Sequence, residues 1–171
     1  MKPTDITFVI LNEEANTYFY DHIYGVYMGD GFLDALHAPL PMKEVAIEGS
    51  RLKHGKEVTF DEKHRKKDSR DLTLSFVIVS DADSIQEARN QLYERRQKLY
   101  AKFYQLKMII TLPDMPDRFY HLLYTGKSMQ HSMNATRTSC TITAKFTELD
   151  PTKLTMGTAV YSEPSVGGGD K

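Results

Sequence analysis

The sequence predicts an α+β domain in which several antiparallel strands pack with one long helix. Three segments carry this prediction: residues 70–80 are patterned as a strand, residues 84–106 are amphipathic with a helical period, and residues 140–147 alternate strictly between apolar and polar side chains. The chain has 171 residues, which is long enough for one domain with its own core and short for two. We therefore interpret residues 1–151 as a single domain and residues 152–171 as a weakly ordered tail.

The first 48 residues predict short strands separated by turns. Ile6 to Leu11 is apolar apart from Thr7 and is interpreted as the first strand. Residues 18–43 mix tyrosines and phenylalanines with glycines and prolines, which favours short strands and turns over a long helix. Glu44 to Glu48 is interpreted as one more short strand. The apolar run is shorter than the roughly 7–15-residue core of a secretory signal peptide, so we expect a protein that is not exported.

Residues 49–69 predict a long exposed loop or β-arm. Lys and Arg outnumber Asp and Glu in this segment, and its one apolar patch is Val58-Thr59-Phe60. A loop of about 20 residues in a compact domain is usually functional or disordered. We interpret it as an arm that contacts a neighbouring subunit, with Phe60 as the anchor. The candidate interface residues are Arg51, Lys53, Val58, Phe60, Lys63, Arg65, Lys66 and Lys67.

Residues 70–79 predict a strand whose apolar face is continuous. Its inward side chains are expected to be Leu72, Leu74, Phe76 and Ile78. Val77 and Val79 on the other face are apolar too, so we expect the distal half of the strand to be covered on both faces.

Residues 84–106 predict a core-facing helix. Ser84 and Glu87 have the spacing of a capping box, in which each side chain accepts a backbone N–H of the other residue. Arg96 falls within the apolar stripe and must extend to solvent or meet a carboxylate, because an unpaired buried charge is costly. The stripe consists of Ile85, Ala88, Leu92, Leu99, Phe103 and Leu106, widened by Tyr93 and Tyr100.

Residues 107–151 predict three more strands. Lys107–Leu112 and Arg118–Tyr124 lie on either side of the Pro113–Pro116 segment, whose prolines and aspartate favour a tight reversal. Thr125-Gly126 predicts a further turn. In the last strand the inward residues are expected to be Cys140, Ile142, Ala144 and Phe146, and Pro151 ends it.

No group of residues predicts a catalytic, cofactor or metal site. Gly126-Lys127-Ser128 matches the end of a phosphate-binding loop, but the pattern needs a glycine at the position of His121. His54 and His64 are ten residues apart in a charged loop, and Cys140 faces the core of its strand, so we expect neither a metal ligand set nor a nucleophile. We therefore expect no enzymatic activity and no cofactor.

The charge distribution argues against nucleic acid or a membrane as the main partner. The formal net charge is −1, so the whole chain has no attraction to polyanions. The basic run at residues 63–67 lies between Asp61-Glu62 and Asp68, and is interpreted as a solvated part of the loop. No apolar run approaches the roughly 20 residues that span a bilayer. The single cysteine, Cys140, excludes an intramolecular disulfide and suits folding in a reducing cytoplasm.

The order of these elements resembles the N-terminal domain of phage distal tail proteins. The resemblance covers residues 44–151, and its most specific pieces are Pro116-Asp-Arg-Phe-Tyr120 and the closing alternating strand that leads into Asp150-Pro151. The other pieces, in order, are a Gly-containing loop at 49–55, the Arg-led strand Arg70-Asp-Leu-Thr-Leu74, the capped helix, the strand that ends at Pro113, and Gly126.

The resemblance implies a tail-tube-like fold, a sandwich or split barrel of two packed antiparallel sheets flanked by the helix. It also implies a structural role in the virion tail: a ring, expected to be hexameric, that joins the tail tube to the tail-tip hub or baseplate, made in the host bacterial cytoplasm. The implied partners are further copies of the chain, the tail tube protein and the hub or baseplate protein, with the tape-measure protein as a candidate. The one nucleic acid that the ring would contact is the genome as it passes through the lumen.

Larger relatives in that family add a carbohydrate-module-like C-terminal domain. Only 20 residues follow Pro151 here, so we expect this sequence to lack it and not to bind the host. Two alternatives stay open: the major tail tube protein, which has a similar fold, and a nucleic-acid-binding adaptor that would use the basic 51–67 loop. An enzyme is the third alternative.

Overall fold

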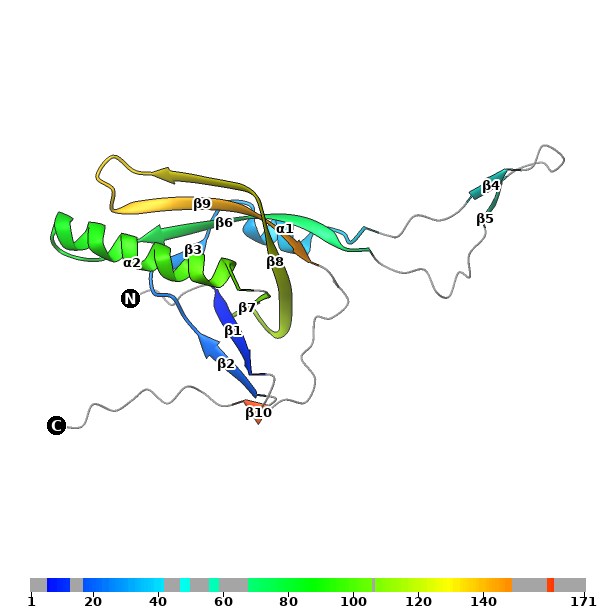
Figure 1. Cartoon of the computed structure of the whole chain (residues 1–171), viewed down its shortest axis with the longest axis horizontal. Helices are drawn as coiled ribbons and strands as arrows, with labels where there is room; N and C mark the ends of the chain where they lie inside the picture. The colour runs from blue at the N-terminus through cyan, green and yellow to red at the C-terminus, as the bar shows by residue number, and fades with distance from the viewer. Residues whose placement is uncertain are drawn as a thin grey trace.

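The computed structural model describes residues 6–12, 17–41, 47–49, 56–58, 68–105, 107–148 and 160–161 (Figure 1). The helices are α1 (Phe32–His37) and α2 (Ile85–Phe103). The strands are β1 (Thr7–Asn12), β2 (Thr17–Asp21), β3 (Val26–Met28), β4 (Ile47–Gly49), β5 (Lys56–Val58), β6 (Arg70–Val79), β7 (Met108–Leu112), β8 (Met115–Met133), β9 (Ser139–Glu148) and β10 (Val160–Tyr161).

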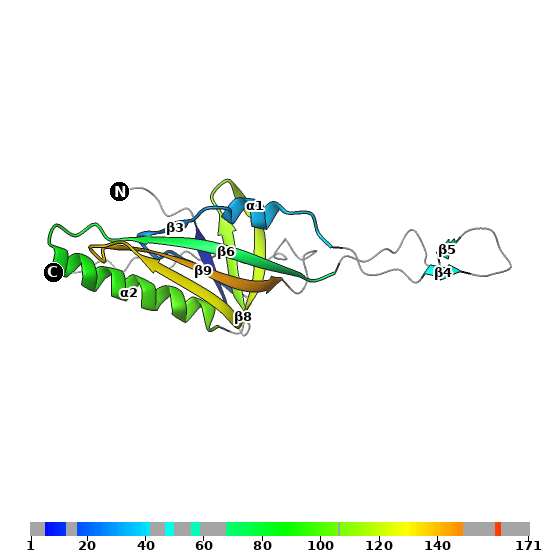
Figure 2. The same ribbon diagram turned by 90° about the horizontal axis from the view of Figure 1, so that it is seen from above.

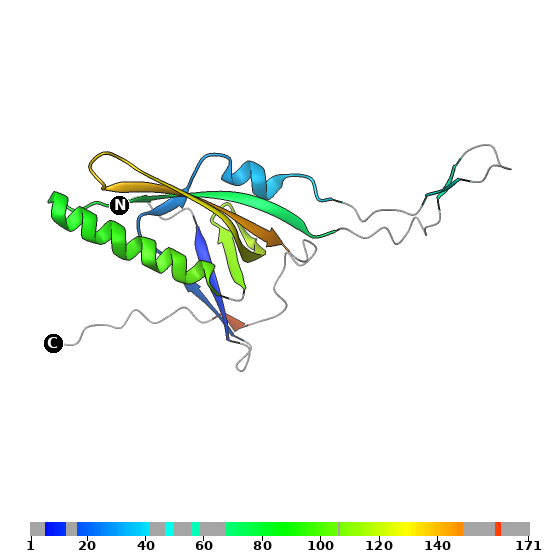
Figure 3. The same cartoon turned by 45° about the horizontal axis from the view of Figure 1, so that its top comes forward.

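Within the described residues, eight strands pair into one sheet in the order β10-β2-β1-β7-β8-β9-β6-β3. All of these pairs are antiparallel except that of β10 with β2. The long strand β8 belongs to both halves, because its first part pairs with β7 and its last part with β9. Figures 1 and 3 show β1, β2 and β7 running steeply across β6 and β9, so the sheet folds into two layers. The sheet is not closed, and the prediction of an α+β, sandwich-like fold is confirmed.

Strand β8 continues through a shift in its pairing register where the sequence predicted a turn. The register between β8 and β9 shifts between Tyr124 and Met129, and Gly126 within that stretch has a φ of 69°. Glycine adopts this left-handed conformation without the steric penalty of a Cβ, so the strand can change register here without ending. The predicted turn at Thr125-Gly126 is therefore wrong, and the strand continues to Met133.

Strands β6 and β9 form the most regular part of the sheet. They pair from Arg70↔Glu148 to Val79↔Ser139 without a register shift. The predicted inward residues are all buried: Leu72, Leu74, Phe76, Ile78, Cys140, Ile142, Ala144 and Phe146. The prediction that both faces of the distal half of β6 are covered is only partly right. Val77 is half-buried, whereas Val79 is 38% exposed.

Helix α2 starts at the predicted cap, since the Ser84 hydroxyl accepts the backbone N–H of Glu87 at 3.2 Å. Two residues of the predicted stripe are outside the core: Ile85 and Tyr93 are 58% and 57% exposed. Ile85 lies in the first turn, which projects beyond the end of β6 in Figure 1, and Tyr93 is about 100° round the helix from Leu92. The helix ends earlier than predicted, and its buried apolar residues are Ala88, Leu92, Leu99 and Phe103.

Helix α1 lies in a segment for which the sequence predicted strands and turns. Phe32 and Leu36 are one turn apart and both buried, so they fix one face of this short helix on the core. Its last carbonyls are capped from a distance: the Arg70 guanidinium donates to the oxygens of Leu36 and Ala38, each at 2.9 Å. Packing and a long-range cap explain why local pattern alone did not predict it.

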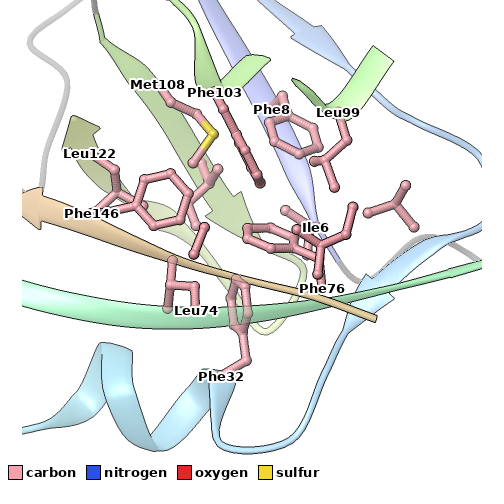
Figure 4. Packing of buried hydrophobic residues seen from close by; sticks show 14 of the residues in the cluster. Ile6, Phe8, Phe32, Leu74, Phe76, Leu99, Phe103, Met108, Leu122 and Phe146 are labelled. Carbon is pink, nitrogen blue, oxygen red and sulfur yellow. The ribbon is translucent and has the colours of Figure 1, made fainter. Parts of the chain in front are cut away.

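One aromatic-rich core joins both layers and both helices (Figure 4). Phe76 of β6 lies within 5.2 to 6.2 Å, between ring centroids, of Phe32 in α1, Phe103 in α2 and Phe146 in β9. Phe8 of β1 enters the same cluster from the other layer. These edge-to-face and tilted contacts add to the burial of apolar area. The core therefore fixes α2 across the sheet.

Of the predicted tail, Val160 and Tyr161 form β10 beside β2. Residues 152–159 and 162–171 lie outside the described residues.

Candidate interaction surfaces

The predicted interface arm corresponds in part to the two-stranded ribbon β4–β5. The strands pair antiparallel with Ile47 opposite Val58 and Gly49 opposite Lys56, and among the described strands they pair with each other alone. Figures 1 and 2 show the ribbon well away from the main sheet. Of the eight candidate interface residues, Val58 lies in β5, and the others are outside the described residues: Arg51, Lys53, Phe60, Lys63, Arg65, Lys66 and Lys67.

The arm leaves and re-enters the domain at one point. The backbone N–H of Asp68 donates to the carbonyl oxygen of Pro41 at 2.9 Å, so the two chain ends that flank residues 42–67 are held together by the domain itself. An insertion whose ends already meet adds little constraint to the fold of the domain. This geometry is compatible with an arm that serves a contact outside its own domain.

A second surface lies where α2 meets the end of β8; we call it the α2–β8 seam. It consists of Arg89, Tyr93 and Arg96 from α2 and His131 and Met133 from β8. Tyr93 and Met133 are 57% and 37% exposed, although both side chains have a large apolar surface. At His131 and Met133, strand β8 pairs with β9 along one backbone edge. Its other edge is unpaired there within the described residues. The seam is thus an exposed aromatic strip along a sheet edge.

Arg96 is the centre of the seam. Its Nη1 lies 3.3 Å from Nε2 of His131, and its guanidinium carbon lies 5.7 Å from the centroid of the Tyr93 ring. Arginine only donates, so His131 accepts through an unprotonated Nε2. The Nε of Arg96 is buried and has no hydrogen-bond partner in the described part of the chain. The sequence predicted that Arg96 either extends to solvent or meets a carboxylate. No described carboxylate pairs with it, so its side chain extends toward solvent.

On the opposite border of α2, Arg95 and Lys102 pair with carboxylates of the same chain. Arg95 donates to Asp81 at 2.7 Å and to the carbonyl of Val79, and the hydrogen bond with Arg95 lowers the pKa of Asp81. Lys102 lies 2.6 Å from an oxygen of Asp21 in β2. The cations on this border therefore pair with carboxylates of their own domain. On the border that faces β8, Arg89 and Arg96 bond instead to the Thr136 carbonyl and the His131 ring.

The exposed side of α1 carries the opposite charge. Asp30 and Asp34 are both exposed, Leu33 between them is 38% exposed, and no described cation pairs with either carboxylate. Helix α1 packs on the β6 side of the sheet. Figure 2 shows α1 and α2 on opposite sides of β6, β9 and β8. The acidic α1 side and the α2–β8 seam are therefore on opposite edges of the molecule.

A third surface is the polar outer face of the β8–β9 hairpin. A shallow hollow there is lined by Gln130, His131, Ser132, Thr141 and Thr143. The outward side chains of Gln130, Ser132, Thr141 and Thr143 are hydroxyls and an amide, which offer hydrogen bonds and no carboxylate or thiol.

The residues weighed for chemistry do not come together into a site within the described part of the chain. Burial raises the pKa of the Cys140 thiol, and the nearby Arg96 charge offsets this in part. Gly126 to Ser128 lies inside β8 and opens no helix. His54 and His64 are outside the described residues, and no group of three or more His, Cys, Asp or Glu among the described ones is arranged to hold a metal ion. No helix in the described ranges has the length and apolar content to cross a bilayer.

Comparison with known proteins leaves the family unassigned. No family model matches the sequence. No curated protein matches it either. Among solved structures, the chain is similar to the crystal structure of the SPP1 Dit protein, described as a paradigm of the hub adsorption apparatus in phages that infect Gram-positive bacteria. The TM-score is 0.45 and the identity 16%, over 76% of this chain and 44% of that one. The chain thus spans less than half the length of that protein, and the likeness is too slight to place it in a family.

Proposed function

We propose that this chain is a structural, non-catalytic protein of a phage tail that forms a hexameric ring between the tail tube and the tail-tip hub or baseplate. The observation that carries the proposal is the order of elements β6, α2, β7, β8 and β9. That order is the one on which the sequence resembles distal tail proteins. The sandwich-like sheets with a flanking helix are also the fold that the resemblance implies.

The surfaces of the molecule suit an assembly role. The described residues offer exposed tyrosines, a methionine and unpaired charges on two edges, and a ribbon that projects from the domain. Exposed aromatic and apolar side chains grouped on one edge are a feature of protein contacts. A ring built from one kind of chain needs two such surfaces on each subunit, because head-to-tail contacts join different patches.

Copy number and position in the particle test the proposal. Tails assembled with an epitope-tagged chain should contain about six copies, and a gold-labelled antibody should mark one end of the tail. Removal of the gene should leave tubes without a completed tip. Label along the whole tube, with many times six copies, would instead identify the major tail tube protein.

The nucleic-acid-binding alternative has a separate test. The proposed ring protein should not shift a DNA fragment at low salt. A shift that weakens steeply as salt rises would favour the adaptor, because phosphate contacts by Lys and Arg release counterions.

A further inference from the structure

We propose that the α2–β8 seam binds a second copy of this chain through the acidic side of α1, formed by Asp30, Leu33 and Asp34. The proposal rests on the self-association in the proposed function and specifies its surfaces. Each subunit would use its seam toward one neighbour and its α1 side toward the other. The partner is therefore identical in sequence and is recognised by a different patch.

The side chains of the seam are those that dominate binding at protein interfaces. Tyr, Arg and Met are enriched in interface cores, and tyrosine and arginine are frequent among the residues whose loss most weakens binding. Tyr93 presents its ring to solvent on one border of α2, and Met133 lies at the adjoining end of β8. Such side chains lose water-exposed apolar area when a partner covers them. The seam thus has the composition of a binding surface.

Arg96 is a prepared anchor for an anionic partner. The contacts with His131 and Tyr93 hold its guanidinium in one place before anything binds. A side chain that is already ordered loses less conformational entropy on binding. Its buried Nε lacks an acceptor in the described residues, and Arg89, one of its neighbours on the helix face, pairs only with a backbone oxygen, that of Thr136. A carboxylate brought by a partner would supply the missing negative charge.

The chain itself supplies a surface of the matching chemistry. Asp30 lies just before α1, and Asp34 lies in its first turn next to the partly exposed Leu33, so the start of α1 carries two exposed carboxylates and an exposed apolar side chain. The cations Arg95 and Lys102 are already paired within the chain, which leaves Arg89 and Arg96 as the ones on α2 that face the seam without a described carboxylate. Complementary charge at the rim and apolar contact at the centre specify a partner better than either does alone.

The two surfaces are placed so that contacts can propagate. They lie on opposite edges of the β6–β9–β8 layer, with α1 on one side and α2 on the other (Figure 2). A contact between two different patches of identical subunits repeats around a rotation axis and closes into a ring when the rotation allows. A contact between the seam of one subunit and the α1 side of the next would therefore be head-to-tail, as a ring requires.

Two charge reversals test the pairing in the full-length chain. Arg96→Asp damages the seam only, and Asp34→Arg damages the α1 side only. We expect each variant alone to self-associate at least about 10-fold more weakly than the natural chain in light scattering and sedimentation. A mixture of the two retains one intact seam and one intact α1 side, so association should return as a 1:1 complex.

Matched controls separate the contact from net charge and from folding. Lys98→Asp and Glu94→Arg make the same charge changes on the exposed face of α2 away from β8, and should leave association unchanged. Tyr93→Ser, at an exposed position, should weaken association without lowering the melting temperature. If a charge variant also melts at a lower temperature than the natural chain, Tyr93→Ser tests the contact without that loss of stability.

The outcomes discriminate between this inference and the proposed function. Association of Arg96→Asp, Asp34→Arg and Tyr93→Ser that equals that of the natural chain would overturn the seam as the contact, and the particle experiment would still decide the proposed function. A mixture that fails to restore association would overturn the pairing of these two surfaces. A natural chain that remains monomeric at the highest soluble concentration would also overturn it.

Discussion

Arg70 and Glu148 form a buried ion pair at the point where β6 begins and β9 ends. The Nε–Oε2 distance is 2.6 Å, and the two side chains are 7% and 1% exposed. The residues are direct cross-strand partners. The remaining nitrogens of the guanidinium donate to carbonyls at the end of α1, so one side chain joins the two most regular strands to a helix. This arrangement fixes the end of the sheet from which residues 42–67 depart.

Glu148→Gln should destabilise the protein by about 3–5 kcal/mol, because the Arg70 charge would stay buried without its counter-charge. Urea unfolding followed by circular dichroism measures this loss. Arg89→Met removes an exposed arginine and should cost less than about 0.5 kcal/mol. Equal losses in the two variants would mean that the pair contributes no more than a surface charge.

Leu99→Ala should cost about 2–5 kcal/mol, because Leu99 is fully buried and the change leaves a cavity in the core. Glu94→Ala, on the exposed face of the same helix, should cost less than about 0.5 kcal/mol. Thermal unfolding of both variants provides the comparison. A Glu94 variant as unstable as the Leu99 variant would show that the buried face of α2 has been assigned to the wrong side.

The sequence predicted the elements in which the residue types themselves show which side is buried or where a helix begins. Strict alternation in β9 identified the buried side of that strand, and the Ser84–Glu87 spacing located the start of α2. Both signals are local, since each depends on a few neighbouring residues and one buried face.

Features that depend on distant residues could not be predicted in this way. Helix α1 exists because Phe32 and Leu36 reach the core and because Arg70, more than 30 residues later, caps its end. The contact of Arg96 with His131 depends on where β8 runs, and β8 extends past Gly126 through a register shift at a stretch that resembles a turn in sequence. The arginine within an apolar stripe was the one sequence signal for the seam.

Gly25→Ala should destabilise the protein more than Gly31→Ala does. Both glycines have left-handed backbones, with φ of 74° and 72°, so both changes carry the strain of about 1–2 kcal/mol expected for a side chain there. A Cβ at position 25 would also collide with the Arg95 guanidinium and the carbonyl of Val79, whereas position 31 is open. The difference in melting temperature between the two variants measures the destabilisation caused by the collision. Equal values would indicate that Arg95 moves aside freely.

The pair of Arg95 with Asp81 should make a small contribution that disappears in acid. The folded-state pKa of Asp81 is lowered, first by the hydrogen bond with Arg95 and then by its charge. The contribution is therefore complete above the unfolded-state pKa of about 3.9 and is lost as pH falls through the lower folded-state value. Asp81→Asn should lower the melting temperature slightly at pH 6, and the difference from the natural chain should vanish near pH 2. A difference that is constant with pH would exclude this cause.

Removal of the arm should separate folding from assembly. Pro41 and Asp68 are already joined by a hydrogen bond of 2.9 Å, so a Gly-Ser-Gly link in place of residues 42–67 spans a gap that the domain itself holds closed. Since β4 and β5 pair with each other and not with the main sheet, their loss removes no strand of the core. We expect a folded chain whose melting temperature is close to that of the full chain, and no closed ring by light scattering or electron microscopy, although the α2–β8 seam and the α1 side remain intact. A shortened chain that still forms rings would assign the arm to a contact with the tube or the hub instead. A shortened chain that fails to fold would mean that residues 42–67 contribute to the sheet of the domain, against the pairing of β4 with β5 alone.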